Sequence, residues 1–120
     1  MSPDRWSAVL PWPPSNNHYY TVARGRKILS PEGRAYGEAA ALACAGQKRP
    51  VQPLSGRLGV EVLVSPPDRR RRDLDNLLKP VLDVLTRSGV IEDDGLIDNL
   101  WIVRQAPSDG GFIQVSVRVL

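Results

Sequence analysis

The chain has 120 residues, 42% of them hydrophobic and 24% charged, and its formal net charge is +3. This length and composition are typical of one soluble domain over residues 1–120, and they exclude two domains of ordinary size. The single cysteine, Cys44, excludes an intrachain disulfide, and no apolar run approaches the roughly 18 residues of a membrane span. Because the N-terminus also lacks a secretory pattern, we expect a cytoplasmic protein that makes no membrane contact.

The first part of the chain predicts a strand, a loop and a helix. Residues 5–11 alternate weakly and predict a strand, whereas the prolines and asparagines of residues 11–20 predict a loop without regular structure. Ser30 is a suitable N-cap and Pro31 suits the first helical position. The alanine-rich sequence that follows therefore predicts a helix to about Gln47.

The second part of the chain predicts three strands and one helix. Residues 58–64 alternate as a half-buried strand does, and apolar residues between 74 and 85 recur at helical spacing up to a stop at 88–89. Residues 96–105 and 112–120 predict two more strands, which we expect to pair as an antiparallel hairpin. The sum is a small α+β domain, with about four strands in a mixed sheet packed with two helices.

Pro80 disturbs the second helix near its start. Its ring removes the usual partner of the Asn76 carbonyl and disfavours helical geometry at Lys79. We therefore predict an irregular first turn over residues 75–79. The apolar stripe of this helix is expected to face its own sheet.

The strongest local charge is the run Arg69 to Arg72, which lies directly before two aspartates. Guanidinium groups are always charged and match phosphate geometry, so these side chains are candidates for binding a DNA backbone. On an extended segment alternate arginines would lie on opposite sides. The alternative is a solvated basic stretch in which the arginines pair with Asp68 and Asp73.

Acidic residues gather at two places in the second part of the chain. Asp73 and Asp75 share a face only if the backbone is extended or irregular there, as Pro80 predicts. With one aspartate of Asp93 and Asp94 they would form the oxygen cluster that Mg²⁺ requires. The alternatives are that Asp73 caps the helix and that residues 92–95 form a simple tight turn.

The proline-rich loop supplies two amides, Asn16 and Asn17, and several aromatic rings. Such side chains on a rigid loop are able to contact DNA bases or sugars. The chain has one histidine and one cysteine, which argues against a zinc site. It also lacks a phosphate-binding glycine loop, so no nucleotide cofactor is expected.

Two segments, LPWPPSNNHYY and PDRRRRDLDNLLKPVLDVLTRSGVIEDD, resemble the RusA family of Holliday junction resolvases. The resemblance covers almost the whole chain in order. It implies a homodimer of small α/β subunits that binds four-way DNA junctions and cuts two opposed strands with the help of Mg²⁺. By position, it also implies metal-binding roles for Asp73, Asp75 and Asp94, an essential role for Lys79 and a DNA contact for Arg72.

The function predicted from the sequence is therefore Mg²⁺-dependent, structure-selective cleavage of four-way DNA by metal-assisted phosphodiester hydrolysis. The predicted catalytic residues are Asp73, Asp75, Lys79 and Asp94. The predicted DNA-binding residues are Arg69, Arg70, Arg71, Arg72, Asn76, Asn16 and Asn17. Three alternatives stay open: a non-catalytic DNA-binding recombination accessory protein, a hydrolase of smaller phosphate esters, and an ion-pair network without function.

Overall fold

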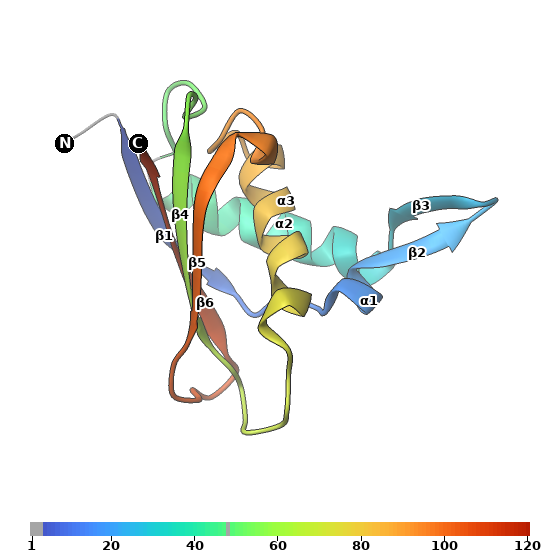
Figure 1. Ribbon diagram of the computed structural model, residues 1–120. Coiled ribbons are helices and arrows are strands. Elements are labelled where there is room, and N and C mark those ends of the chain that lie inside the picture. Colours follow the sequence, from blue (N-terminus) through green and yellow to red (C-terminus); the bar gives the residue numbers. More distant parts are fainter. Residues whose placement is uncertain (1–3, 48) are drawn as a thin grey trace.

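The alternating segments of the sequence form the strands of one sheet (Figure 1). In the computed structural model, which describes residues 4–47 and 49–120, the strands lie in the order β1-β6-β4-β5. Their bounds are Arg5–Pro11 for β1, Leu58–Ser65 for β4, Ile97–Arg104 for β5 and Phe112–Val119 for β6. All four strands and the α+β class are as predicted.

The pairing of the last two strands differs from the prediction. β4 pairs in parallel with β5, so that Glu61 lies opposite Trp101, and it pairs antiparallel with β6, so that Val62 lies opposite Val115. The sheet is therefore mixed, but the expected β5–β6 hairpin is wrong. β4 is buried along most of its length, which favours a central place, and residues 105–111 cross the roughly 10 Å between β5 and β6.

The two predicted helices form with the expected ends. α2 (Pro31–Gly46) begins at Ser30, whose hydroxyl oxygen accepts a hydrogen bond of 2.9 Å from the Gly33 backbone N–H. The second helical segment opens as a 3₁₀ turn, η1 (Leu74–Leu77), and continues as α3 (Leu78–Arg87). The predicted irregular start is confirmed, because Pro80 falls in the first turn of α3, where backbone N–H groups have no helical partner.

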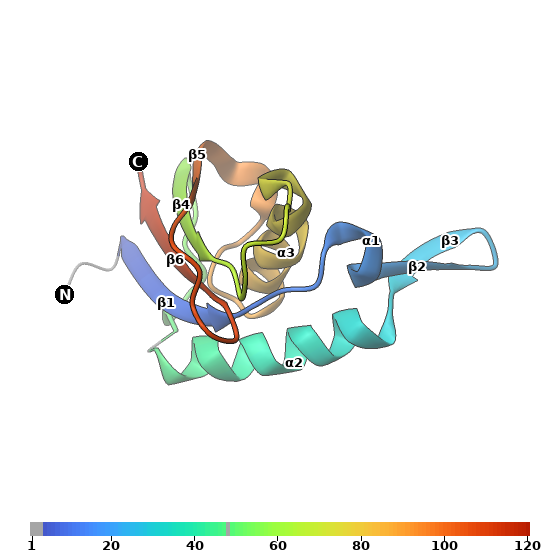
Figure 2. The ribbon, with the colours of Figure 1, turned by 90° about the horizontal axis from the view of Figure 1, so that it is seen from below.

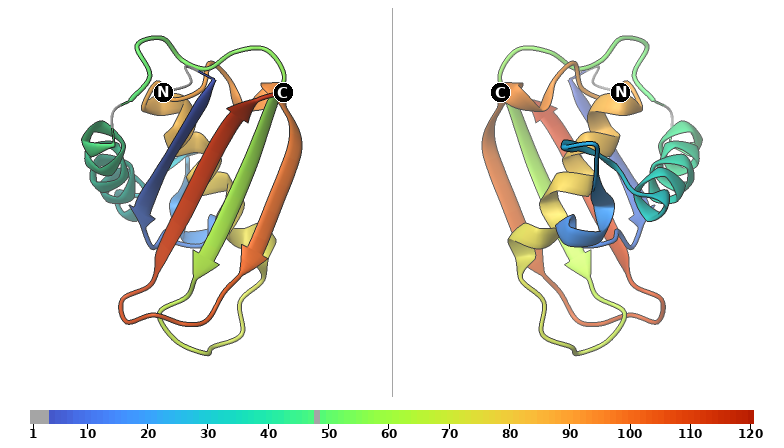
Figure 3. Two further views of the ribbon diagram at one scale, coloured as in Figure 1. Left: turned by 90° about the vertical axis from the view of Figure 1, so that its left-hand side faces the viewer. Right: turned by 90° about the vertical axis from the view of Figure 1, so that its right-hand side faces the viewer.

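Both long helices cover the same face of the sheet (Figures 2 and 3). Val81 and Leu85 of α3 are fully buried against sheet residues such as Val62, so the apolar stripe faces its own sheet as predicted. Figure 3 shows the other face without a covering helix, and Trp101 there is 63% exposed. Within the described residues, no helix has the length and apolar character needed to cross a membrane.

A short helix lies in the segment that was expected to be loop, and a two-stranded ribbon follows it. α1 (Asn16–Tyr19) is one turn long and leads directly into β2 (Tyr20–Ala23) and β3 (Arg26–Leu29). The loop prediction is thus wrong for its last five residues. The turn at Arg24 and Gly25 has φ angles of 52° and 73°, which match the left-handed geometry of a tight hairpin turn. The ribbon projects away from the sheet and the long helices (Figure 1).

Candidate functional site

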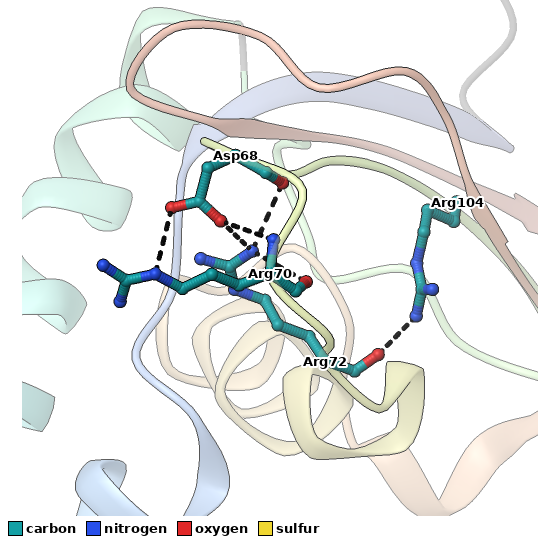
Figure 4. Close-up of polar contacts among 4 residues, drawn as sticks. All are labelled: Asp68, Arg70, Arg72 and Arg104. Atoms are coloured by element: carbon teal, nitrogen blue, oxygen red, sulfur yellow. Dashed lines mark hydrogen bonds and ion pairs between the residues drawn. The ribbon is translucent and has the colours of Figure 1, made fainter.

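Asp68 organises the arginine loop, which we define as residues 66–73 (Figure 4). Its carboxylate accepts hydrogen bonds from the Arg70 backbone N–H at 2.9 Å and from Arg72 Nη1 at 2.8 Å. These two interactions, that with Arg72 first, lower the pKa of the Asp68 carboxyl below its ordinary value. The alternative in which the arginines pair with acids is thus correct for Asp68.

Residues far apart in the sequence hold Arg72 in place. Its guanidinium carbon lies 5.6 Å from the centroid of the Trp12 ring, and the Arg104 guanidinium donates to its backbone carbonyl oxygen (Figure 4). The Ser108 backbone N–H donates to the Pro66 carbonyl oxygen at 2.8 Å, which joins the arginine loop to the β5–β6 connection. Arg104 was missed by the sequence reasoning because no local pattern links it to Arg72.

Arg69 and Arg71 differ from their neighbours. Both are exposed, and neither forms an ion pair with any residue in the described part of the chain. Arg70 and Arg72 share Asp68, in agreement with the expected alternation of sides. The loop therefore presents two guanidinium groups without an acidic partner among the residues described and two that Asp68 partly neutralises.

Asp73 and Asp75 lie on the irregular backbone at the start of the second helical segment. Asp73 is extended, with φ −85° and ψ 131°, and Asp75 follows in the first turn of η1. The Asp73 side chain does not cap η1, so that alternative is wrong. Both residues are exposed, and neither carboxylate has a hydrogen bond or ion pair within residues 4–47 and 49–120.

Lys79 and Asp94 approach each other from separate segments. Asp94 begins the 3₁₀ turn η2 (Asp94–Leu96) just before β5, and Lys79 lies in the first turn of α3. The Lys79 Nζ is 3.8 Å from Asp94 Oδ2, with the two side chains 51% and 34% exposed. The parallel β4–α3–β5 arrangement makes this approach possible, because the segment before β5 returns alongside α3.

The described residues of a single chain do not gather three carboxylates at one metal position. Among the described residues, no three histidine, cysteine, aspartate or glutamate side chains are arranged to hold a metal ion. Asp73 and Asp75 nevertheless offer unengaged carboxylate oxygens, which Mg²⁺ prefers. Mg²⁺ also needs only one or two protein carboxylates when water and phosphate oxygens complete its shell. The donor chemistry therefore fits Mg²⁺, although the three-carboxylate group is incomplete in one chain.

Tyr19 and Tyr20, two of the aromatic residues of the proline-rich loop, border the site. The Tyr19 hydroxyl donates to the Asp83 carboxylate, which also pairs with Arg87 Nε at 2.8 Å. Burial raises the pKa of the Tyr20 phenol, and the Asp83 charge raises it further. Lys79 and Asp94 also act on this pKa, in opposite directions. Tyr20 therefore stays protonated at neutral pH within electrostatic range of the Lys79–Asp94 pair.

The predicted amides occupy different environments. Asn17 is exposed on α1, whereas the buried Oδ1 of Asn16 has no hydrogen-bond partner among the described residues. Asn76 is partly buried on η1, between the two aspartates and Lys79 in sequence. Asp98, just after the start of β5, forms an ion pair with Arg57 at 2.8 Å.

Comparison with known proteins identifies the family. The family model described as Endodeoxyribonuclease RusA matches residues 11–118. The crossover junction endodeoxyribonuclease rusA of Enterobacteria phage 82 is 39% identical over 109 residues, covering 91% of this chain and 90% of that protein. The crossover junction endodeoxyribonuclease RusA of Escherichia coli strain K12 is 38% identical over 112 residues, covering 93% and 92%.

A third relative extends the same result. The crossover junction endodeoxyribonuclease RusA of Shigella sonnei strain Ss046 is 37% identical over 118 residues, covering 93% of this chain and 92% of that protein. The matched region includes both the arginine loop and the segment that carries Asp94. The chain therefore belongs to the RusA family of endodeoxyribonucleases.

Proposed function

We propose that this protein is a Mg²⁺-dependent, structure-selective endonuclease that resolves four-way DNA junctions by paired symmetric nicks. The observation that carries the proposal is the Lys79–Asp94 approach, together with an exposed arginine loop and two aspartates that have no partner in the described part of the chain. This arrangement combines cation-binding oxygens, an ammonium group and guanidinium groups, which phosphodiester hydrolysis on DNA requires. Membership of the family supports the same substrate.

Asp73, Asp75 and Asp94 are the residues that would hold Mg²⁺. A bound Mg²⁺ would supply Lewis-acid polarisation of the phosphate and a water more acidic than bulk water. Because one chain does not gather the three carboxylates, we infer that their final approach accompanies assembly of the protein on its DNA. Water and phosphate oxygens would then occupy the remaining coordination positions.

The basic residues act on the phosphate itself. Lys79 is placed to stabilise the negative charge that develops on the phosphate as the bond to the leaving oxygen breaks. Arg69 and Arg71, which have no acidic partner among the described residues, offset the repulsion between the aspartates and the DNA backbone. Arg72 is held by Asp68 and Trp12, so its guanidinium is oriented before DNA arrives.

The substrate geometry supports a homodimer. A four-way junction offers two equivalent strands, and paired symmetric nicks require two active sites related by a two-fold axis. One chain contributes one set of Asp73, Asp75, Lys79 and Asp94. We therefore propose that two copies of the chain act together on one junction.

A synthetic four-way junction tests the proposal. The labelled junction is incubated with the protein in the presence and absence of Mg²⁺, with a linear duplex of the same sequence as the control substrate. We expect paired incisions at symmetric positions in the junction, only with Mg²⁺. Junction binding without incision would instead support an accessory protein, and release of product from free nucleotides would support a hydrolase of small phosphate esters.

A further inference from the structure

The β2–β3 ribbon, residues 20–29, carries three positive charges and contains no acidic residue. Arg24, Arg26 and Lys27 fall within four positions, and the sequence contains no aspartate or glutamate from residue 5 to residue 31. None of these three side chains forms an ion pair with a residue that the structure describes. The ribbon is therefore strongly attractive to a polyanion.

The ribbon is also unusually accessible. Every residue from 21 to 28 is exposed, including Val22 at 73%, and the ribbon extends beyond α1 away from the rest of the molecule (Figures 1 and 2). A two-stranded hairpin is only marginally stable when nothing covers it. Its exposure therefore indicates a surface that is completed by binding.

The strand register distributes the charges around the ribbon. Lys27 lies opposite Val22 on the face that also carries Tyr20, and its Nζ lies 4.4 Å from the centroid of that ring. Arg26 lies opposite Ala23 on the other face, and Arg24 occupies the turn. Positive groups thus lie on both faces and at the tip.

This distribution matches a DNA groove, which has a row of phosphates on each side. The major groove is about 12 Å wide and admits a two-stranded ribbon. Each strand of the ribbon is four residues long, or roughly 13 Å, so it reaches two or three phosphates rather than a full helical turn. A ribbon with cations on both faces is able to contact both rows.

We propose that the β2–β3 ribbon grips the backbone phosphates of one duplex arm of the DNA substrate. The inference rests on the proposed function and adds a contact outside the arginine loop. The ribbon follows directly after α1, which contacts η1 and α3, so the gripped arm would lie on the side of the molecule that carries the candidate nuclease site.

The test removes two charges while preserving the hairpin. The ribbon variant combines Arg24→Asn with Arg26→Gln. Arg24→Asn creates an Asn-Gly turn, which is the favoured sequence for this left-handed geometry, so the hairpin is expected to keep its fold. The matched control, Arg5→Gln with Arg118→Gln, removes the same charge from neighbouring positions of the β1–β6 pair. Binding to a synthetic four-way junction is measured without divalent metal over a range of salt concentrations.

We expect the ribbon variant to flatten the slope of log K against log salt by roughly 3.6 for a dimer, because each of its two chains loses two phosphate contacts and each contact changes the slope by about 0.9. The control should keep the wild-type slope, and Arg24→Lys with Arg26→Lys should restore it. An equal flattening of the slope in the ribbon variant and in the control would overturn the inference, because the change in net charge alone would then explain it. An unchanged slope together with a smaller sedimentation coefficient of the ribbon variant would also overturn the inference. The ribbon would then contact the partner subunit rather than DNA.

The same data separate this inference from the proposed function. Wild-type protein that fails to bind the junction would overturn the proposed function. Wild-type protein that binds, with an unchanged slope in the Arg24→Asn, Arg26→Gln variant, would overturn the ribbon assignment alone. A flattened slope with a normal cleavage rate at saturating protein would support both.

Discussion

The ammonium nitrogen of Lys79 lies 3.8 Å from a carboxylate oxygen of Asp94, although the two residues belong to different segments on either side of the turn between α3 and β5. Both side chains are partly exposed, so the pair contributes at most about 1 kcal/mol to stability. We propose that the pair serves cleavage rather than folding.

Replacement of Lys79 by glutamine should therefore affect cleavage far more than folding. We expect a loss of roughly 100-fold or more in the single-turnover cleavage rate, because a charge that stabilises the transition state is removed. The thermal unfolding midpoint should change by no more than a few degrees. Lys79→Arg provides the control, since it keeps the charge, and comparable losses in both variants would argue for packing instead.

Magnesium binding should depend on DNA. Because the described residues of one chain contain no complete three-ligand group, free protein should bind Mg²⁺ at least roughly tenfold more weakly than protein on a junction. Isothermal titration calorimetry measures both affinities. The Asp73→Asn, Asp75→Asn double variant with the same junction gives the Mg²⁺ binding that does not depend on these two carboxylates. Equal affinities in the free and bound states would contradict the proposed assembly.

Replacement by lysine should affect junction binding differently at Arg72 and at Arg69. Arg72 lies over Trp12 and bonds Asp68 in a geometry that lysine cannot reproduce, whereas Arg69 is exposed and unpaired within the described residues. We expect Arg72→Lys to weaken junction binding about fivefold and Arg69→Lys to leave it within twofold. Removal of the Arg72 charge, as in Arg72→Gln, should also raise the pKa of Asp68, which NMR titration detects.

The Tyr19–Asp83 hydrogen bond should make stability sensitive to alkaline pH. Burial, followed by the bond to Asp83, raises the pKa of the Tyr19 phenol above its ordinary value of about 10. A raised pKa means that the folded state holds the proton more tightly, so this stabilisation is complete below about pH 10 and is lost as the pH rises further. Tyr19→Phe should cost about 2 kcal/mol at neutral pH.

Chemical unfolding at several pH values checks this prediction. The Tyr19→Phe variant should lose less stability than the wild type between neutral pH and pH 11, because it has no phenol to ionise at this position. If both proteins lose the same free energy of unfolding over that pH range, ionisation of Tyr19 does not cause the loss of stability at alkaline pH.

Two glycines of α2 provide a matched pair. A Cβ at Gly33 would overlap the Tyr19 carbonyl oxygen, whereas a Cβ at Gly37 would meet nothing within 4 Å. Gly33→Ala should therefore destabilise the protein by more than 1 kcal/mol, and Gly37→Ala should stabilise it by up to about 1 kcal/mol through helix propensity. Unfolding free energies measured in denaturant distinguish the two, and similar values would contradict the close approach of α2 to Tyr19.

Local rules predicted most of the secondary structure. The cap at Ser30, the alternation in β6 and the irregular turn before Pro80 depend on a few neighbouring residues, and each appears as expected. The ribbon at residues 20–29 was missed because its four-residue strands lack a buried face and its turn is Arg-Gly rather than Asn-Gly. The insertion of β4 between β5 and β6 was missed because strand order depends on long-range packing.

The candidate site likewise has features that follow from local sequence and features that depend on tertiary packing. The sequence indicated that Asp73 and Asp75 lie on irregular backbone, since Pro80 acts locally. The proximity of Asp94 to Lys79 came from the family resemblance, because only the parallel crossover between β4 and β5 brings their segments together. Arg104 contacts the arginine loop through the same tertiary arrangement, which no spacing in the sequence reveals.

The central claim is that the unpaired aspartates serve chemistry and not folding or DNA affinity. The most direct test is single-turnover cleavage of a four-way junction by Asp75→Asn, together with its junction affinity and unfolding midpoint. The account predicts a normal midpoint, junction binding within a few-fold of wild type, and cleavage reduced to background at saturating Mg²⁺. Cleavage by this variant at the wild-type rate would contradict the account.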